Sequence, residues 1–168
     1  TRCSRDWSSD VCSSDLLDRE ICAWLESIAG VSAESLMQEL MMIDSPLAVK
    51  SASEVIRGDL KLYKEHSYRF ALSQVEENNL ELLHQRCTEL KSEVERIIRS
   101  EGLDFMGLLV TDPVRGNSEL LFIGSPAVAR NMPYARRSDS IFQLPGVLSR
   151  KKQLLPQILS IIASVGKV

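Results

Sequence analysis

Residues 149–152, Ser-Arg-Lys-Lys, carry the clearest chemistry in this sequence. They follow a short apolar run, residues 146–148, and precede an apolar helical pattern that begins at Leu154. The start of a helix attracts anions because its first backbone N–H groups are free and the helix dipole is positive there. Arg150 adds a planar pair of donors that can bind two phosphate oxygens, and Lys151 adds a mobile positive charge. The segment therefore predicts a phosphate-binding site at a helix start.

A solvated basic surface is the alternative interpretation, because short basic runs near a chain terminus often have no partner. The flanking residues 144–146 and 154–156 combine leucine with proline, and in the first case glycine. Such segments favour turns and burial, which a freely solvated tail does not need. The context therefore favours the binding site.

The composition sets the class of protein. The chain has 168 residues, 44% of them hydrophobic, and a net charge of −3, which fits one globular domain with a helical appendage. A general nucleic-acid binder needs a broad basic face, which an acidic chain does not supply, so we expect no nucleic-acid partner. No apolar run approaches the length that spans a bilayer and no secretory signal is evident, so we expect a cytoplasmic protein without membrane contact. The four cysteines show no metal-ligand spacing.

The first sixteen residues differ from the rest of the chain. They have neither helical nor strand periodicity, and Ser-Ser-Asp occurs twice within them. They look like translated sequencing-adapter sequence, so we expect residues 1–16 to lie outside the fold.

Three helices are predicted next, in a segment that we assign to residues 17–58 as a helical linker. The first runs from Asp18 to a cap at Gly30, and the second from Ser32 until Pro46 stops it, with Met37, Met41 and Met42 as gap-filling core residues. Residues 51–54 read Ser-Ala-Ser-Glu, a capping box that opens a third helix, which Gly58 closes.

The rest of the chain alternates strand and helix patterns. Alternation predicts a strand over 68–75, a continuous apolar run predicts a buried strand over 105–111, and residues 120–124 pair with it across a turn. Helices are predicted over 79–102, from Pro126, and over 154–163, with a loop over 130–139 and a last strand over 141–147. The pattern gives an α/β fold in which helices flank a mixed central sheet, preceded by a short helical segment.

Three ordered stretches carry a resemblance to a known family. Residues 146–153 read Gly-Val-Leu-Ser-Arg-Lys-Lys-Gln, residues 59–61 read Asp-Leu-Lys, and residues 108–112 are followed by the run 121–124. The chain from about residue 17 resembles the C-terminal part of manganese-dependent, family II inorganic pyrophosphatases. The resemblance implies that residues 59–168 form the DHH-associated, substrate-binding domain of that family.

The resemblance also implies how such an enzyme divides its work. An N-terminal DHH domain, absent from this chain, would hold manganese, magnesium or cobalt, and the C-terminal domain would close over diphosphate as it is hydrolysed to two phosphates. Carried over by position, Arg150, Lys151 and Lys61 bind phosphate oxygens, and Ser149 positions the backbone beside them. The chain alone would then be an inactive lid without catalytic or metal-binding residues. The resemblance leaves open whether the parent protein is a homodimer.

Other assignments stay open beside this one. An exopolyphosphatase of the related prune type would use a similar domain, and a stand-alone anion-binding module would have no catalysis. The chain has no Asp-His-His motif; its two histidines, His66 in a turn and His84 on a helix face, lack ligand spacing. Asp112 ends a buried strand, where we expect it to cap the following turn rather than to face a site.

Overall fold

The computed structural model describes residues 16–36, 39 and 45–165. The chain divides into two compact units, Thr1–Leu40 and Met41–Val168. In the first unit, helix α1 spans Leu16–Ala29 and Gly30 ends it at a φ of 66°, as predicted. Residues 33–36 are helical, which agrees with the expected second helix. Residues 1–15, Met37, Met41 and Met42 lie outside the described residues.

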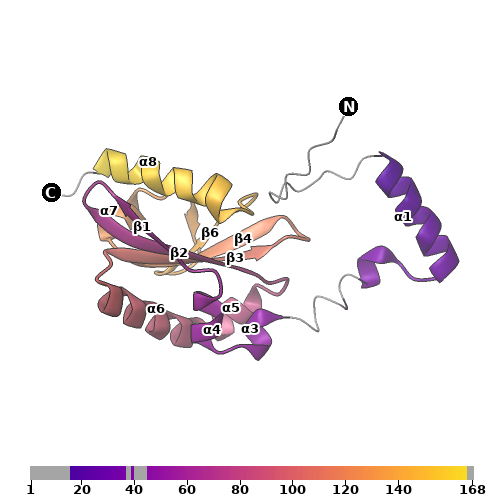
Figure 1. Cartoon of the computed structure of the whole chain (residues 1–168), viewed down its shortest axis with the longest axis horizontal. Coiled ribbons are helices and arrows are strands. Elements are labelled where there is room, and N and C mark those ends of the chain that lie inside the picture. Colours follow the sequence, from indigo (N-terminus) through magenta and orange to yellow (C-terminus); the bar gives the residue numbers. More distant parts are fainter. Residues whose placement is uncertain (1–15, 37–38, 40–44, 166–168) are drawn as a thin grey trace. The chain divides into compact units, whose positions relative to one another are not determined.

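One mixed sheet forms the centre of the second unit (Figure 1). Across the sheet its strands are β1 (Lys61–Glu65), β2 (Tyr68–Glu76), β3 (Phe105–Asp112), β4 (Asn117–Gly124), β6 (Ile141–Gln143) and β5 (Ala135–Arg136). β2 and β3 run parallel, and every other neighbouring pair is antiparallel. The predicted fold class, an α/β fold with a mixed sheet flanked by helices, is confirmed.

Helices cover both faces of the sheet (Figure 1). One face carries α3 (Pro46–Val49), α4 (Ala52–Arg57), α5 (Glu81–Gln85) and α6 (Cys87–Glu101). The other carries α7 (Pro126–Arg130) and α8 (Leu155–Val165), which the π-helical turn η1 (Arg150–Leu154) precedes. Because the last helical segment begins at Arg150 and not at Leu154, the basic residues lie inside its first turn.

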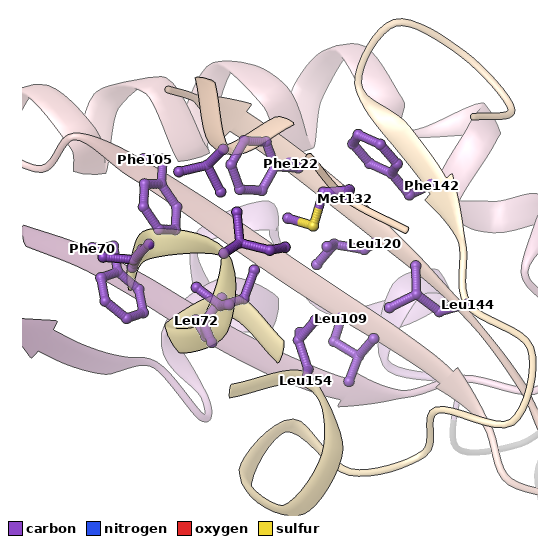
Figure 2. Close-up of a cluster of buried hydrophobic side chains, with 14 of the residues drawn as sticks. Phe70, Leu72, Phe105, Leu109, Leu120, Phe122, Met132, Phe142, Leu144 and Leu154 are labelled. Atoms are coloured by element: carbon purple, nitrogen blue, oxygen red, sulfur yellow. The ribbon is translucent and has the colours of Figure 1, made fainter. Parts of the chain in front are cut away.

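Aromatic rings join the strands on the α8 face (Figure 2). Tyr63 stacks on Phe70, and Phe70 stacks on Phe105 with ring centroids 4.8 Å apart. Phe105 contacts Phe122, which in turn meets Phe142 edge-on at 6.2 Å. Such pairs stabilise a sheet through cross-strand packing, with about 0.5–1.5 kcal/mol each beyond burial of their area. The row of rings fixes the positions of β1 to β6 relative to one another.

Polar contacts explain where the helices differ from the sequence predictions. The predicted helix over 79–102 is broken at Arg86, whose guanidinium donates to the carbonyls of Leu47 at 2.6 Å and Lys50 at 2.8 Å. Pro46 begins α3 rather than only stopping the helix before it, with Ser45 as its N-cap. The predicted capping box at Ser51 is present on α4. Tertiary contacts thus set the boundaries of these short helices.

Two further differences concern strands. β1 was not predicted, because most of its residues are exposed and no alternation marks it. The last strand, expected over 141–147, ends at Gln143, since Pro145 and Gly146 turn the chain at a φ of 75° for the glycine. The chain therefore leaves the sheet after this turn and runs across its α8 face.

Gly124 is the glycine on which the sheet depends most. Its φ is 111°, and a Cβ there would lie 2.4 Å from the carbonyl oxygen of Asp104 and 2.6 Å from Cα of Phe105. We expect Gly124→Ala to lower the free energy of unfolding by about 3 kcal/mol or more. Gly116→Ala is the matched control, since its φ is 68° but no atom lies within 4 Å, and it should cost about 1 kcal/mol. Urea unfolding measures both, and equal losses would contradict the packing argument.

Candidate functional site

The predicted phosphate segment forms the first turn of η1. Ser149 is its N-cap, and its hydroxyl accepts from the backbone N–H of Lys152 at 3.1 Å. Leu154, four residues after Arg150, is fully buried in the core beneath the sheet's α8 face (Figure 2). A π-helical turn widens the helix locally and is found often at functional sites. The basic turn is thus anchored to the core by its last residue.

Two glutamine carboxamides hold the backbone that leads into this turn. Gln153 accepts from the N–H groups of Leu148 and Ser149 at 2.8 and 2.9 Å and donates to the carbonyl of Gly146 at 2.8 Å. Gln74 of β2 donates to the carbonyl of Leu148 at 3.0 Å and accepts from the N–H of Arg150 at 2.9 Å. The segment after β6 is therefore fixed to β2.

The same segment is also tied to β4 on its way. The N–H of Gly146 donates to the carbonyl of Gly116 at 3.0 Å, and the hydroxyl of Ser118 donates to the carbonyl of Val147 at 2.6 Å. The backbone thus passes from β6 over β4 to β2 with a bond at each stage. Buried or half-buried backbone groups that are all paired give a rigid segment.

One sequence expectation about this turn is wrong. Free backbone N–H groups at the helix start were expected to attract the anion, but those of Ser149, Arg150 and Lys152 are bonded to side chains of the protein. Gln153 accepts from Ser149, Gln74 accepts from Arg150, and the Ser149 hydroxyl accepts from Lys152. The turn therefore offers an anion mainly its charged side chains.

The guanidinium of Arg150 lies against the loop before β1. Its Nη1 donates to the carbonyl oxygen of Asp59 and lies 2.8 Å from Oδ2 of the same residue. The Arg150 side chain is only 10% exposed, whereas that of Asp59 is 47% exposed. Its Nε is buried and has no hydrogen-bond partner in the described part of the chain. A buried cation whose Nε has no partner needs an explanation, because nearly all buried polar groups are paired.

The contact with Asp59 brings the predicted site residues together. Lys61 begins β1 two residues after Asp59, and Lys151 follows Arg150, so the ion pair joins the two cationic segments. Lys61 and Lys151 are both exposed, and neither makes an ion pair with another described residue. Ser149 is half-buried and caps the turn. The ion pair therefore places the segment that carries Lys61 beside the turn that carries Arg150 and Lys151.

Three polar residues of this arrangement were missed as site residues by the sequence reasoning. Asp59 was quoted only as part of a motif, Gln74 as one position of a strand and Gln153 as the end of a signature. The signal at Gln74 is a polar side chain on the face of β2 that otherwise carries Phe70 and Leu72. A polar residue on an apolar face indicates that its side chain has a buried hydrogen-bond partner, but it does not identify that partner.

A pocket of about 460 Å³ lies elsewhere, beside β4 and β6, and its lining includes Glu119, Tyr134 and Arg137. Glu119 is buried and accepts from Arg137 at 2.8 Å, while Glu81 accepts from the same guanidinium at 3.0 Å. The hydrogen bond to Glu119, and next that to Glu81, raises the pKa of Arg137. Two carboxylates already neutralise this arginine, so the pocket attracts anions weakly.

The histidines and Asp112 have structural contacts. His84 was expected on a helix face; its Nε2 lies 2.7 Å from Oε2 of buried Glu119, an ion pair when the imidazole is protonated. His66 lies in the turn between β1 and β2, at a φ of 52°. Asp112 accepts from the N–H groups of Val114 and Arg115, so its predicted role as a turn cap is confirmed. No group of three or more His, Cys, Asp or Glu side chains among the described residues could hold a metal ion.

Comparison with known proteins identifies the family. The sequence model of the DHHA2 domain matches residues 38–161, a range that contains Lys61, Gln74 and the basic turn. The chain belongs to the DHHA2 domain family. This DHHA2 domain includes α3 and α4, whose residues Leu47 and Ile56 are fully buried in the same core as β3.

Similar proteins are inorganic pyrophosphatases by name. The cobalt-dependent inorganic pyrophosphatase of Clostridium perfringens is 31% identical over 148 residues, which are 88% of this chain and 27% of that protein. The manganese-dependent inorganic pyrophosphatase of Methanothrix thermoacetophila is 29% identical over 147 residues, 85% of this chain and 47% of that protein. The predicted resemblance to family II pyrophosphatases is thereby confirmed.

A solved structure agrees with the sequence relatives. The crystal structure described as a family II inorganic pyrophosphatase of Methanococcus jannaschii superimposes with a TM-score of 0.65 at 26% identity, over 86% of this chain and 48% of that one. The DHHA2 chain therefore spans about half the length, or less, of the relatives it matches. Helices of the described residues include none long and apolar enough to cross a membrane.

Gln74 should control the order of the basic turn. Gln74→Leu removes a carboxamide that bonds both Leu148 and Arg150 and leaves their backbone groups without these partners, a loss of about 1–3 kcal/mol. We expect the amide of Arg150 to exchange with solvent deuterium at least about tenfold faster in this variant. Gln143→Leu, at an exposed residue of β6, is the control and should leave that rate unchanged. Equal exchange in the two variants would refute the anchoring role.

Proposed function

We propose that this chain is the substrate-binding part of an inorganic pyrophosphatase, in which Arg150, Lys151 and Lys61 bind the phosphate oxygens of diphosphate and Ser149 holds the turn that carries them. The observation that supports this most is the buried guanidinium of Arg150, whose Nε lacks a partner, beside two exposed lysines. The names of the relatives support the substrate, since both are inorganic pyrophosphatases.

Charge explains why these residues suit diphosphate. The substrate carries several negative charges, and its hydrolysis builds further charge on the leaving phosphate. Three cations neutralise that charge, and each charge-assisted hydrogen bond contributes about 1.5–3 kcal/mol. The chain as a whole is acidic, at −3, so the binding is local rather than a property of the surface. The loop that carries Arg150 is already rigid, which reduces the entropy lost on binding.

The metal-dependent half of the reaction belongs to another part of the protein. Metal ions bound there would supply Lewis-acid chemistry and activate water for attack on the substrate. The described residues hold no cluster that fits such an ion, so we assign no metal step to this chain. The parent protein is then a hydrolase with a preceding DHH domain that binds manganese, cobalt or magnesium, and this part alone is a lid. A cytoplasmic location and a dimeric parent stay predictions.

Domain closure would strengthen the contacts between the lid and diphosphate. When the preceding domain and the lid close over diphosphate, water leaves the site and each contact with Arg150 and Lys151 becomes stronger. Exposed Lys61 and Lys151 can move toward the substrate, whereas Arg150 is held by its neighbours. The lid thus combines one fixed cation with two mobile ones.

Binding of pyrophosphate to the chain itself tests the proposal. We expect the backbone NMR signals of Lys61, Arg150 and Lys151 to shift on titration, and Arg150→Ala to weaken binding about tenfold to a hundredfold. Lys61→Ala should weaken it less, because an exposed lysine is screened by water.

Matched controls separate these effects from general loss of positive charge. Lys64→Ala removes the same charge from the opposite face of β1, and Arg99→Ala removes an exposed arginine from α6 on the other side of the sheet. Neither should change the affinity by more than about twofold. Shifts that avoid Lys61 and Arg150, or no binding by the unchanged chain, would contradict the proposal.

A further inference from the structure

The donors of Arg150 are divided between two edges of its guanidinium. Nη1 is committed to Asp59, since it donates to the carbonyl oxygen and lies 2.8 Å from the carboxylate. Nε, on the other edge, is buried without a partner. No described acceptor is bonded to Nη2 either. One side of the planar fork is therefore bonded to Asp59, and the other edge has no partner among the described residues.

Burial of this unpaired edge costs free energy that a bound anion would recover. A buried donor without a partner loses its hydration, and nearly all buried polar groups in folded proteins have a partner. Nε and Nη2 lie side by side on one edge of the group, with the spacing that suits two oxygens of one phosphate. Nε and Nη2 thus form the edge of the guanidinium that Asp59 leaves unpaired, and the position of Asp59 decides which edge that is.

On the basis of the proposed function, we infer that Asp59 is a positioning residue: it holds Nη1 of Arg150 so that Nε and Nη2 together receive one phosphate of diphosphate. Asp59 contacts Arg150 and does not itself bind substrate. The same contact sets the distance between the Lys61 segment and the basic turn, because Asp59 lies two residues before Lys61.

The carboxylate of Asp59 also repels phosphate, which by itself would weaken substrate binding. That carboxylate is 47% exposed, so water screens its repulsion, whereas the Arg150 side chain that it orients is 10% exposed. Contacts made by a desolvated and oriented guanidinium are stronger than a screened repulsion. Orientation therefore outweighs repulsion, and removal of the carboxylate should weaken binding rather than strengthen it.

The experiment uses pyrophosphate as the probe and the Nε–Hε signal of Arg150 in proton–nitrogen NMR as the readout. Saturating pyrophosphate should move this signal downfield in the unchanged chain and slow its exchange with water, because Nε gains an acceptor. Asp59→Asn keeps the backbone acceptor but loses the charge, and should weaken binding about threefold to tenfold. Asp59→Glu keeps the charge at a half-exposed position and should bind within about threefold of the unchanged chain.

Asp139→Asn is the matched control, because Asp139 is exposed near β5 at the opposite edge of the sheet. It removes the same charge and should change neither the affinity nor the Nε–Hε signal. Tighter or unchanged binding by Asp59→Asn, or an Nε–Hε signal that ignores bound pyrophosphate, would overturn this inference while leaving the proposed function in place. If the unchanged chain does not bind pyrophosphate, both fail together.

Discussion

The double hydrogen bond between the Gln74 carboxamide and the backbone of Leu148 and Arg150 is the contact on which the site depends. It joins residues 74 and 76 positions apart in the chain and connects β2, an inner strand of the sheet, to the last helical segment. Ser118 and Gln153 also hold the segment after β6, but among the described residues only Gln74 ties the backbone of Arg150 itself to the sheet. With it, the direction in which Arg150 leaves the backbone follows from the position of β2, which the row of aromatic rings fixes.

The site combines rigidity in its backbone with freedom in its charges. The carboxamides of Gln74 and Gln153 and the hydroxyl of Ser149 accept from backbone N–H groups of the turn, so the turn is held firmly and offers its charged side chains to an anion. Arg150 is buried and held by Asp59, while Lys61 and Lys151 extend into solvent. A fixed guanidinium provides orientation, and mobile lysines provide attraction that adapts as a second domain closes.

Much of the fold could be predicted from the sequence, because strong periodicity marks the strands over 68–75 and 105–111 and caps mark α4 and the end of α6. β1 could not, since it is an exposed edge strand held by pairing with β2 rather than by an apolar face. The break at Arg86 was also hidden, because it depends on carbonyls of α3 and the loop after it. Periodicity reports burial, and these features depend on long-range hydrogen bonds.

The candidate site was predicted in part for the same reason. The basic turn and Lys61 stand out by residue type and by resemblance, but the contact of Arg150 with Asp59 spans 91 residues and leaves no local pattern. Gln74 and Gln153 looked like ordinary polar residues until their partners were known. The sequence shows where charged residues stand in the chain, whereas the direction of each charged side chain depends on the fold.

The most direct test of the central claim is a crystal structure of this chain with pyrophosphate bound. We expect one phosphate with two oxygens on Nε and Nη2 of Arg150, Nη1 still on Asp59, and Lys61 and Lys151 turned toward the anion. Pyrophosphate bound instead at Arg137 in the pocket beside β4, with the Arg150 edge still vacant, would contradict it.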